Sequence, residues 1–241
     1  MNFMDCFNQW KSDDFFDFDT HTELAALDPA TDGKEIEDRF YRDLEFGTGG
    51  LRGVMGAGTN RMNKYTVGKA TTGLSNYLLE KFGRQVCASR GVAVCFDTRN
   101  NSRFFAETVA NILSGKGIKA YLFRDARPTP QLSFSVRYLG AIAGVNITAS
   151  HNPAQYNGYK VYDEHGCQLV PYQAEQVIAF VNAVNDYHDI NFNGDAPLIK
   201  EVDTTDDFVH AVLKQQRITD NAVKANLHVV YTPLHGTGLI P

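Results

Sequence analysis

The hydrophobic and polar positions of this chain follow a helical rhythm near its start. Residues 34–46 carry apolar side chains at helical spacing among charged ones, which predicts a surface helix that ends at Gly47. A second helix is expected over residues 64–82, where Gly83 ends the pattern. The segment between them has six glycines in the twelve residues 47–58 and is expected to be loop or short strand with exposed backbone amides.

From residue 91 onward, short β-branched runs alternate with helical segments. Strands are expected at 91–96, 118–123 and 141–148, and helices at 103–117, 131–140, 172–187 and 206–217. This alternation predicts an α/β fold with a mixed, mainly parallel sheet flanked by helices. Sites in such folds gather in loops at the carboxyl ends of the strands, and the polar segments 97–102 and 149–160 fall there.

The last stretch, residues 226–241, is expected to begin a new strand and a glycine-containing turn. A β-α unit at this point lacks both its helix and its sheet neighbours. We therefore expect residues 1–200 to form one domain and residues 201–241 to be the incomplete start of a second, similar domain. The sequence is expected to be a fragment of a longer protein.

Composition narrows the class of protein. Of the 241 residues, 43% are hydrophobic and 21% charged, which allows a sizeable core and excludes wholesale disorder. The formal net charge is -5 and no basic run occurs, so neither a nucleic-acid nor a membrane partner is expected. No apolar run approaches the roughly 18 residues of a spanning helix, so a cytoplasmic location is expected. The four cysteines form no CxxC pair, which argues against a zinc site and against a disulfide framework.

The segment TASHNPAQYNGYK, residues 148–160, holds the most chemically suggestive side chains. Ser150 at a strand end could act as a nucleophile, with His151 as its base. Consecutive residues on an extended loop point in different directions, however, and no G-x-S-x-G elbow is present, so a serine hydrolase is disfavoured.

Phosphoryl transfer suits these residues better, because it needs positioned cations and amide donors around a phosphate. Lys160 follows an expected turn at Asn157 and Gly158 and could reach back toward Ser150. Arg52 sits in the glycine-rich segment, where the backbone can approach an anion and the guanidinium can grip a phosphate. The alternative is that the Ser-His-Asn-Pro sequence serves only as a turn.

Three motifs together resemble one enzyme family. TASHNPAQYNGYKVY resembles the phosphoserine loop of the α-D-phosphohexomutases, which include phosphoglucomutases and phosphomannomutases. FGTGGLRGVMGAGTNRMN resembles another motif of the same first domain, and YTPLHGTG resembles the opening strand of the second domain. Their order and spacing are similar to those of the longer phosphoglucomutase and phosphopentomutase branch.

The resemblance implies an isomerase that moves phosphate between the 1- and 6-hydroxyls of a hexose through a sugar bisphosphate, here glucose 1,6-bisphosphate. Ser150 would carry the phosphate and give it to the phosphorylated sugar substrate. Its phosphate would also supply one oxygen to a Mg²⁺ ion, a metal that favours hard oxygen ligands. A phosphomannomutase, a phosphopentomutase and a non-catalytic phosphosugar-binding module remain alternatives, and the oligomeric state is not predicted.

The resemblance also implies roles for single residues. Lys160 is expected to act as the base and Arg52 as the phosphate clamp; a lysine does this only where neighbouring positive charge favours its neutral form. His151 either orders the loop or contacts the phosphate. Asn152, a further candidate for phosphate binding, is more simply structural.

Two further residues are left with open alternatives. Arg99 matches a family arginine near the phosphoserine, or it only orders the loop through an ion pair with Asp97. His235 faces the cleft or caps a turn. The family's Asp-Gly-Asp-x-Asp-Arg metal loop, its Gly-Glu-x-Ser-Gly sugar loop and its Arg-x-Ser-Gly-Thr phosphate loop do not occur in the sequence. We therefore expect the remaining magnesium ligands to lie outside this chain, and the chain alone to be inactive.

Overall fold

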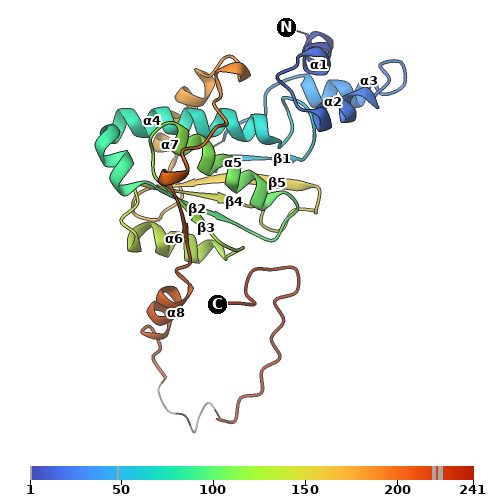
Figure 1. The fold of residues 1–241 in the computed structure, drawn as a ribbon. Coiled ribbons are helices and arrows are strands. Elements are labelled where there is room, and N and C mark those ends of the chain that lie inside the picture. Colours follow the sequence, from blue (N-terminus) through green and yellow to red (C-terminus); the bar gives the residue numbers. More distant parts are fainter. Residues whose placement is uncertain (1, 48, 219–220, 222–224) are drawn as a thin grey trace.

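The structure, a computed structural model, describes residues 2–47, 49–218, 221 and 225–241. A six-stranded sheet with helices on both faces forms its body (Figure 1). The strands, in the spatial order β1-β5-β4-β2-β3-β6, are β1 Leu51–Val54, β5 Tyr156–Tyr162, β4 Ala143–Ile147, β2 Val92–Phe96, β3 Ala120–Phe123 and β6 Ile199–Val202. Strands β4, β2, β3 and β6 run parallel, while β5 is antiparallel to both β4 and β1. The expected α/β class with a mixed, mainly parallel sheet is confirmed.

The helices form two layers and a separate N-terminal group (Figure 1). They are α1 Phe3–Ser12, α2 Phe18–Ala25, α3 Gly33–Phe40, α4 Lys64–Arg90, α5 Ser102–Gly115, α6 Thr129–Tyr138, α7 Pro171–Asn182 and α8 Thr205–Leu213, with short 3₁₀ turns at Tyr187–Asp189 and Ala196–Leu198. Helices α4, α5 and α7 pack together over one face of the sheet, and α6 covers the other. None of the described helices is long and apolar enough to span a membrane.

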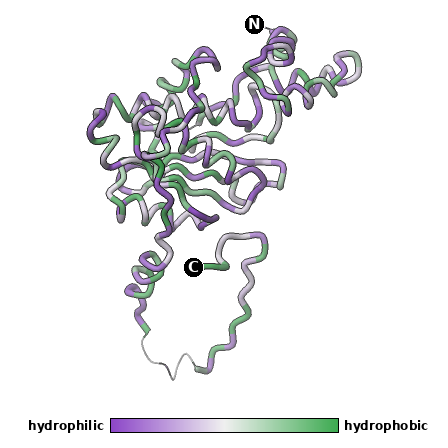
Figure 2. Tube along the Cα trace, viewed as in Figure 1, coloured by the Kyte–Doolittle hydropathy of each residue, from purple (hydrophilic) through white to green (hydrophobic). Residues whose placement is uncertain are grey.

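The hydrophobic core lies between the sheet and its helices. Strands β2 and β4 are buried along their whole length, as expected for central strands of a parallel sheet. Figure 2 shows the hydrophobic residues concentrated in these strands. A second core holds α1, α2 and α3 against the start of α4, with Trp10 stacked on Phe16 at 4.2 Å and packed edge-on against Tyr65. Sequence reasoning did not predict α1 and α2.

The helix expected over residues 34–46 is too long, because α3 ends at Phe40. The following segment leaves the helix to join the main core. Leu44 donates its N–H to the Thr59 carbonyl at 2.8 Å, and Phe46 is buried beside the sheet. Gly83 interrupts α4 as expected, with φ 76°, but helical structure continues beyond it to Arg90.

Residues 156–162 form strand β5, so the turn expected at Asn157 and Gly158 is wrong. Pairing with two neighbouring strands overrides the turn-like local sequence, because each backbone group finds a partner in the ladder. A Cβ at Gly158 would lie 2.6 Å from the Thr148 carbonyl oxygen and 2.9 Å from that of Leu51. Glycine is therefore needed at position 158 because the backbone of neighbouring strands approaches closely there, and not because the chain turns.

The described part of the C-terminal segment, residues 225–241, contains no strand, so the strand expected to begin at 226 is not formed. A strand needs a paired neighbour, and none of the described strands pairs with this extended segment. It returns toward the sheet near its end, where the Thr98 hydroxyl donates to the His235 carbonyl at 3.1 Å (Figure 1). Strand β6 spans residue 200, where sequence reasoning placed the end of the first domain; the division into domains stays a prediction.

Candidate functional site

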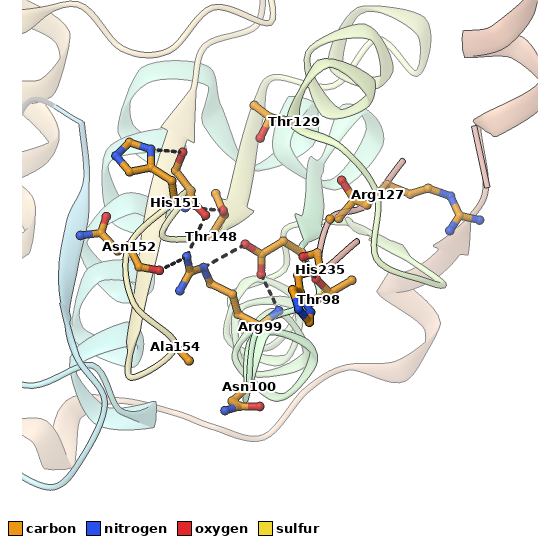
Figure 3. A pocket seen from close by; sticks show the side chains of 14 residues that line it. Thr98, Arg99, Asn100, Arg127, Thr129, Thr148, His151, Asn152, Ala154 and His235 are labelled. Carbon is orange, nitrogen blue, oxygen red and sulfur yellow. Dashed lines mark hydrogen bonds and ion pairs between the residues drawn. The ribbon is translucent and has the colours of Figure 1, made fainter. Parts of the chain in front are cut away.

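A cavity of about 720 Å³ opens at the carboxyl ends of β2 and β4, where the fold class places a site (Figure 3). Its lining consists of Asp97, Thr98, Arg99, Asn100, Arg127, Thr129, Thr148, Ser150, His151, Asn152, Ala154, His235, Gly236 and Thr237. The cavity therefore gathers Ser150, His151, Asn152 and Arg99, but neither Arg52 nor Lys160 belongs to its lining.

Ser150 stands at the mouth of this cavity in a left-handed conformation. Its φ is 57°, a region that costs a residue with a Cβ roughly 1–2 kcal/mol. Its backbone N–H donates to the hydroxyl of Thr148 at 2.9 Å, and its side chain is exposed. Strain of this kind persists only where surrounding contacts impose it, and it is common at functional sites.

Arg99 imposes the shape of the loop that carries Ser150. Its guanidinium donates to four backbone carbonyls, those of Ser150 at 2.7 Å, Asn152 at 2.5 Å, Pro153 at 2.9 Å and Tyr156 at 3.1 Å. Figure 3 shows the first two of these hydrogen bonds. Its side chain is 13% exposed and lies 3.5 Å from the Asp97 carboxylate. The structure thus gives Arg99 a loop-ordering role, and its direct contact with a phosphate stays a prediction.

Hydrogen bonds among partly and fully buried side chains hold Arg99 and its loop in place. The Asp97 carboxylate accepts from the Arg99 backbone N–H at 3.0 Å and from the Ser102 hydroxyl at 2.7 Å. Asn157 on β5 donates to the same hydroxyl at 3.0 Å and to the Asn100 carbonyl at 3.0 Å. The loop after β2 is therefore held to β5, and sequence reasoning missed Asn157 because it interpreted the residue as part of a turn.

His151 lies beside Ser150, with 3.4 Å between Nδ1 and the serine Oγ. The expectation that the two side chains point apart is wrong, because the left-handed backbone of Ser150 turns its side chain back toward its neighbour. A hydrolase relay also needs a carboxylate that orients the histidine. Within the described residues no carboxylate is hydrogen-bonded to His151, so the relay lacks its third member.

Arg52 reaches the loop from β1, at the edge of the sheet. Its Nη1 donates to Asn152 Oδ1 at 3.1 Å, so the exposed guanidinium is tied to the residue two positions after Ser150. Arg52 is paired with Gly158 across the β1–β5 ladder. Carbonyl oxygens of Thr148 and Leu51 lie close over Gly158, so the backbone of the loop approaches β1 and β5 closely beside Arg52.

Lys160 lies in β5 rather than on a loop. It pairs with Asn146 of β4, while Arg52 pairs with Gly158 two residues earlier in β5, so Lys160 and Arg52 share one face of the sheet as diagonal neighbours. The structure brings these two cations to one face beside the loop, and contact between Lys160 and Ser150 stays a prediction.

Several lining residues had no signal in the sequence. Arg127 is buried and holds the start of α8, donating to Asp203 at 3.0 Å and to the Thr205 hydroxyl at 2.8 Å. Hydrogen bonds from Thr205, together with the nearby Arg127 charge, outweigh burial and hold the pKa of Asp203 below its usual range. The role of Arg127 depends on contacts with residues far away in the sequence, so no local motif could predict it.

The comparisons with known proteins agree with the geometry. A family model described as "Phosphoglucomutase/phosphomannomutase, alpha/beta/alpha domain I" matches residues 43–188. The chain belongs to this phosphoglucomutase/phosphomannomutase family. The resemblance drawn from the three motifs is thereby confirmed at the level of the family.

Relatives within the family are similar over most of the chain. A phosphoglucomutase of Staphylococcus haemolyticus is 39% identical over 208 residues, which cover 84% of this chain and 37% of that protein. One of Staphylococcus epidermidis is 37% identical over 215 residues, again 37% of its length. The chain thus spans little more than a third of the curated relatives it matches.

Solved structures show the same fold. A putative phosphomannomutase from Thermus thermophilus matches with a TM-score of 0.64 and 29% identity, covering 78% of this chain and 39% of the other. The phosphoglucomutase parafusin of Paramecium, at 17% identity and a TM-score of 0.57 over 73% of this chain and 36% of its own, shares the fold alone.

Proposed function

We propose that the chain is the phosphoserine-bearing part of an intramolecular phosphotransferase that acts in the cytoplasm. The enzyme interconverts glucose 1-phosphate and glucose 6-phosphate through glucose 1,6-bisphosphate. One observation carries the proposal: Ser150 stands exposed and strained at a cavity mouth, on a loop that Arg99 holds by its carbonyls. Membership of the phosphoglucomutase/phosphomannomutase family supports it.

In the proposed step, phosphate leaves Ser150 for a sugar hydroxyl. The bond between phosphorus and Ser150 Oγ breaks, and a bond between phosphorus and the sugar oxygen forms. The hydroxyl proton passes to Lys160 and from there to the serine oxygen. Arg52 would stabilise the negative charge of the transferred group, since a guanidinium can bind two phosphate oxygens at once.

His151 and Asn152 would support this step. The ring of His151 lies next to the serine oxygen and can donate to a phosphate there. Asn152 accepts a hydrogen bond from Arg52 and so holds the guanidinium beside the loop. Arg99 acts on the backbone, because its two terminal nitrogens already donate to carbonyl oxygens.

Magnesium would take one oxygen from the phosphate on Ser150 and neutralise charge on it. Among the described residues there is no group of three or more His, Cys, Asp or Glu side chains that could hold a metal ion. The residues present therefore do not fit a complete magnesium site. We propose that the other ligands belong to the larger part of the enzyme that curated relatives have and this chain does not span.

Glucose is the proposed sugar because the similar staphylococcal proteins are phosphoglucomutases. A phosphomannomutase or phosphopentomutase of the same family is the second candidate, favoured by the structural match to the Thermus protein. A non-catalytic module that binds phosphosugars is the third.

Phosphate release to sugars tests the proposal. The enzyme that joins this chain to the further part that curated relatives have, phosphorylated on Ser150, is mixed with glucose 1-phosphate, mannose 1-phosphate or ribose 1-phosphate in the presence of Mg²⁺. Bisphosphate products are measured by anion-exchange chromatography. Glucose 1,6-bisphosphate is expected as the main product, and the Ser150→Ala variant should form none. A phosphorylated enzyme that releases phosphate to none of the three sugars supports the binding module instead. In a coupled assay, we expect negligible isomerisation of glucose 1-phosphate by the chain alone.

A further inference from the structure

In the side-chain amide of Asn146, the nitrogen has a hydrogen-bond partner and the oxygen has none. Asn146 lies in β4 and is 1% exposed. Its Nδ2 donates to the Thr129 hydroxyl at 2.8 Å, while its Oδ1 is buried and accepts no hydrogen bond. Buried amide oxygens are almost always paired, because leaving one without a donor is costly. The free oxygen therefore calls for a donor close to β4.

The hydrogen bond to Thr129 restricts where the oxygen of the Asn146 amide can point. Thr129 is the first residue of α6, which packs over β2 and β4. In a planar amide the nitrogen and the oxygen diverge, so an amide whose nitrogen is held toward α6 turns its oxygen away from it. Strand β5 lies on the side of β4 opposite to β2. Side chains of β5 on this face therefore border the free end of the amide.

Lys160 occupies the facing position on β5. It is paired directly with Asn146 in the antiparallel ladder, and directly opposed residues share a face, with Cβ atoms about 5 Å apart. Its side chain is half-buried, and within the described residues its ammonium has no hydrogen bond or ion pair. An ammonium offers donors only, and its flexible stem can bring them to an oxygen at this distance.

Other side chains on this face have partners elsewhere. Arg52 donates to Asn152 at the loop, and the Thr148 hydroxyl accepts from the Ser150 N–H. The Thr129 hydroxyl is already engaged with the nitrogen of the same amide. Lys160 is therefore the donor that matches the free oxygen of Asn146 in position, charge and reach.

We propose that Asn146 is a positioning residue for Lys160, accepting a hydrogen bond from its ammonium through Oδ1. The row Thr129, Asn146, Lys160 then links the first turn of α6 to the lysine across two strands. It holds the amine on the face where Arg52 lies, and Asn146 itself precedes Ser150 by four residues in the sequence. The contact is inferred from the strand register and the unpaired oxygen, whereas its part in proton transfer rests on the proposed function.

The contact is tested by measuring how fast the Lys160 amine is acetylated in the unphosphorylated 241-residue chain. Trace acetylation at neutral pH, followed by peptide mass spectrometry, gives the rate at Lys160 relative to Lys200, an exposed lysine on β6. Asn146→Leu keeps the size of the side chain and removes its acceptor. A lost hydrogen bond should raise the relative rate about fivefold, because a bond of ordinary strength changes the free-amine population by that factor. An unchanged ratio in a folded variant overturns the proposal.

A second measurement covers the case in which Asn146→Leu does not fold. Lys160→Met keeps the length of the half-exposed side chain and removes its donor. The side-chain amide resonances of Asn146, followed by ¹H–¹⁵N spectroscopy, should shift in this variant and stay in place in the control Lys200→Met. Resonances that do not move contradict the proposal. Neither measurement uses a sugar or a phosphate, so a negative result here leaves the proposed function standing.

Discussion

The guanidinium of Arg99 donates to the backbone carbonyl of Ser150 at 2.7 Å. Through this bond and three others, the loop after β2 dictates the shape of the loop after β4. The arginine is itself braced by Asp97. The sequence linked Arg99 to phosphate binding. In the structure its hydrogen bonds instead set the shape of the loop that carries Ser150.

Replacing Arg99 with lysine should destabilise the protein, although the charge is kept. A single ammonium cannot serve carbonyls of four residues at once, so we expect a loss of about 2–3 kcal/mol in the free energy of unfolding. Urea denaturation measures it. Arg84→Lys, at an exposed position on α4, is the matched control and should change little. Equal effects of the two substitutions would contradict the clamp.

The left-handed backbone of Ser150 makes a specific prediction about stability. Ser150→Gly should raise the free energy of unfolding by about 1 kcal/mol relative to Ser150→Ala, because glycine adopts φ 57° without a steric cost. Both variants lose the hydroxyl, so their comparison isolates the backbone. Denaturant titration of the pair checks the prediction, and equal stability of glycine and alanine variants would show that no strain is present.

Gly158 should tolerate no side chain. The added methyl of Gly158→Ala would meet two carbonyl oxygens at 2.6 Å and 2.9 Å, which forces β5 away from its neighbours. We expect a cost of about 2–3 kcal/mol, measured by thermal or urea unfolding. Gly33→Ala is the control, since a Cβ at Gly33 has nothing within 4 Å. If both substitutions are neutral, the close approach of the strands is not as described.

Asp17 should make stability depend on acid pH. Burial acts to raise its pKa, but hydrogen bonds from Lys64 and Thr20 outweigh this and lower the pKa to about 2. Since the unfolded value is about 3.9, the carboxylate's contribution is full above roughly pH 5 and is lost as pH falls toward 2. Partial exposure limits it to about 1 kcal/mol. Asp17→Asn keeps the N-cap acceptor, so its stability deficit should shrink between pH 5 and pH 2.5 in urea titrations.

Much of the central sheet could be predicted from the sequence. The β-branched runs near residues 91, 118 and 141 form β2, β3 and β4, because buried parallel strands leave a continuous apolar signal. The position of the site followed from the same reasoning, since Ser150 and Arg99 lie in loops at the carboxyl ends of neighbouring strands.

What sequence reasoning missed depends on pairing across long separations. Asn157 and Gly158 read locally as a turn, yet they form part of a strand because β1 and β4 lie on either side of it. Burial of Asn157 with Ser102 has no local signature either. The contact between Ser150 and His151 arises from one unusual dihedral angle, which an extended-loop assumption cannot anticipate.

Whether Ser150 carries phosphate tests the proposed function most directly. The enzyme that joins these 241 residues to the further part that curated relatives have is incubated with glucose 1,6-bisphosphate and Mg²⁺. Its intact mass is measured before and after, with peptide sequencing to locate the change. We expect a species heavier by about 80 Da, the mass of one phosphoryl group, mapped to Ser150 and absent from the Ser150→Ala variant. An enzyme that gains no phosphate, or gains it at another residue while Ser150 stays unmodified, would contradict the proposed function.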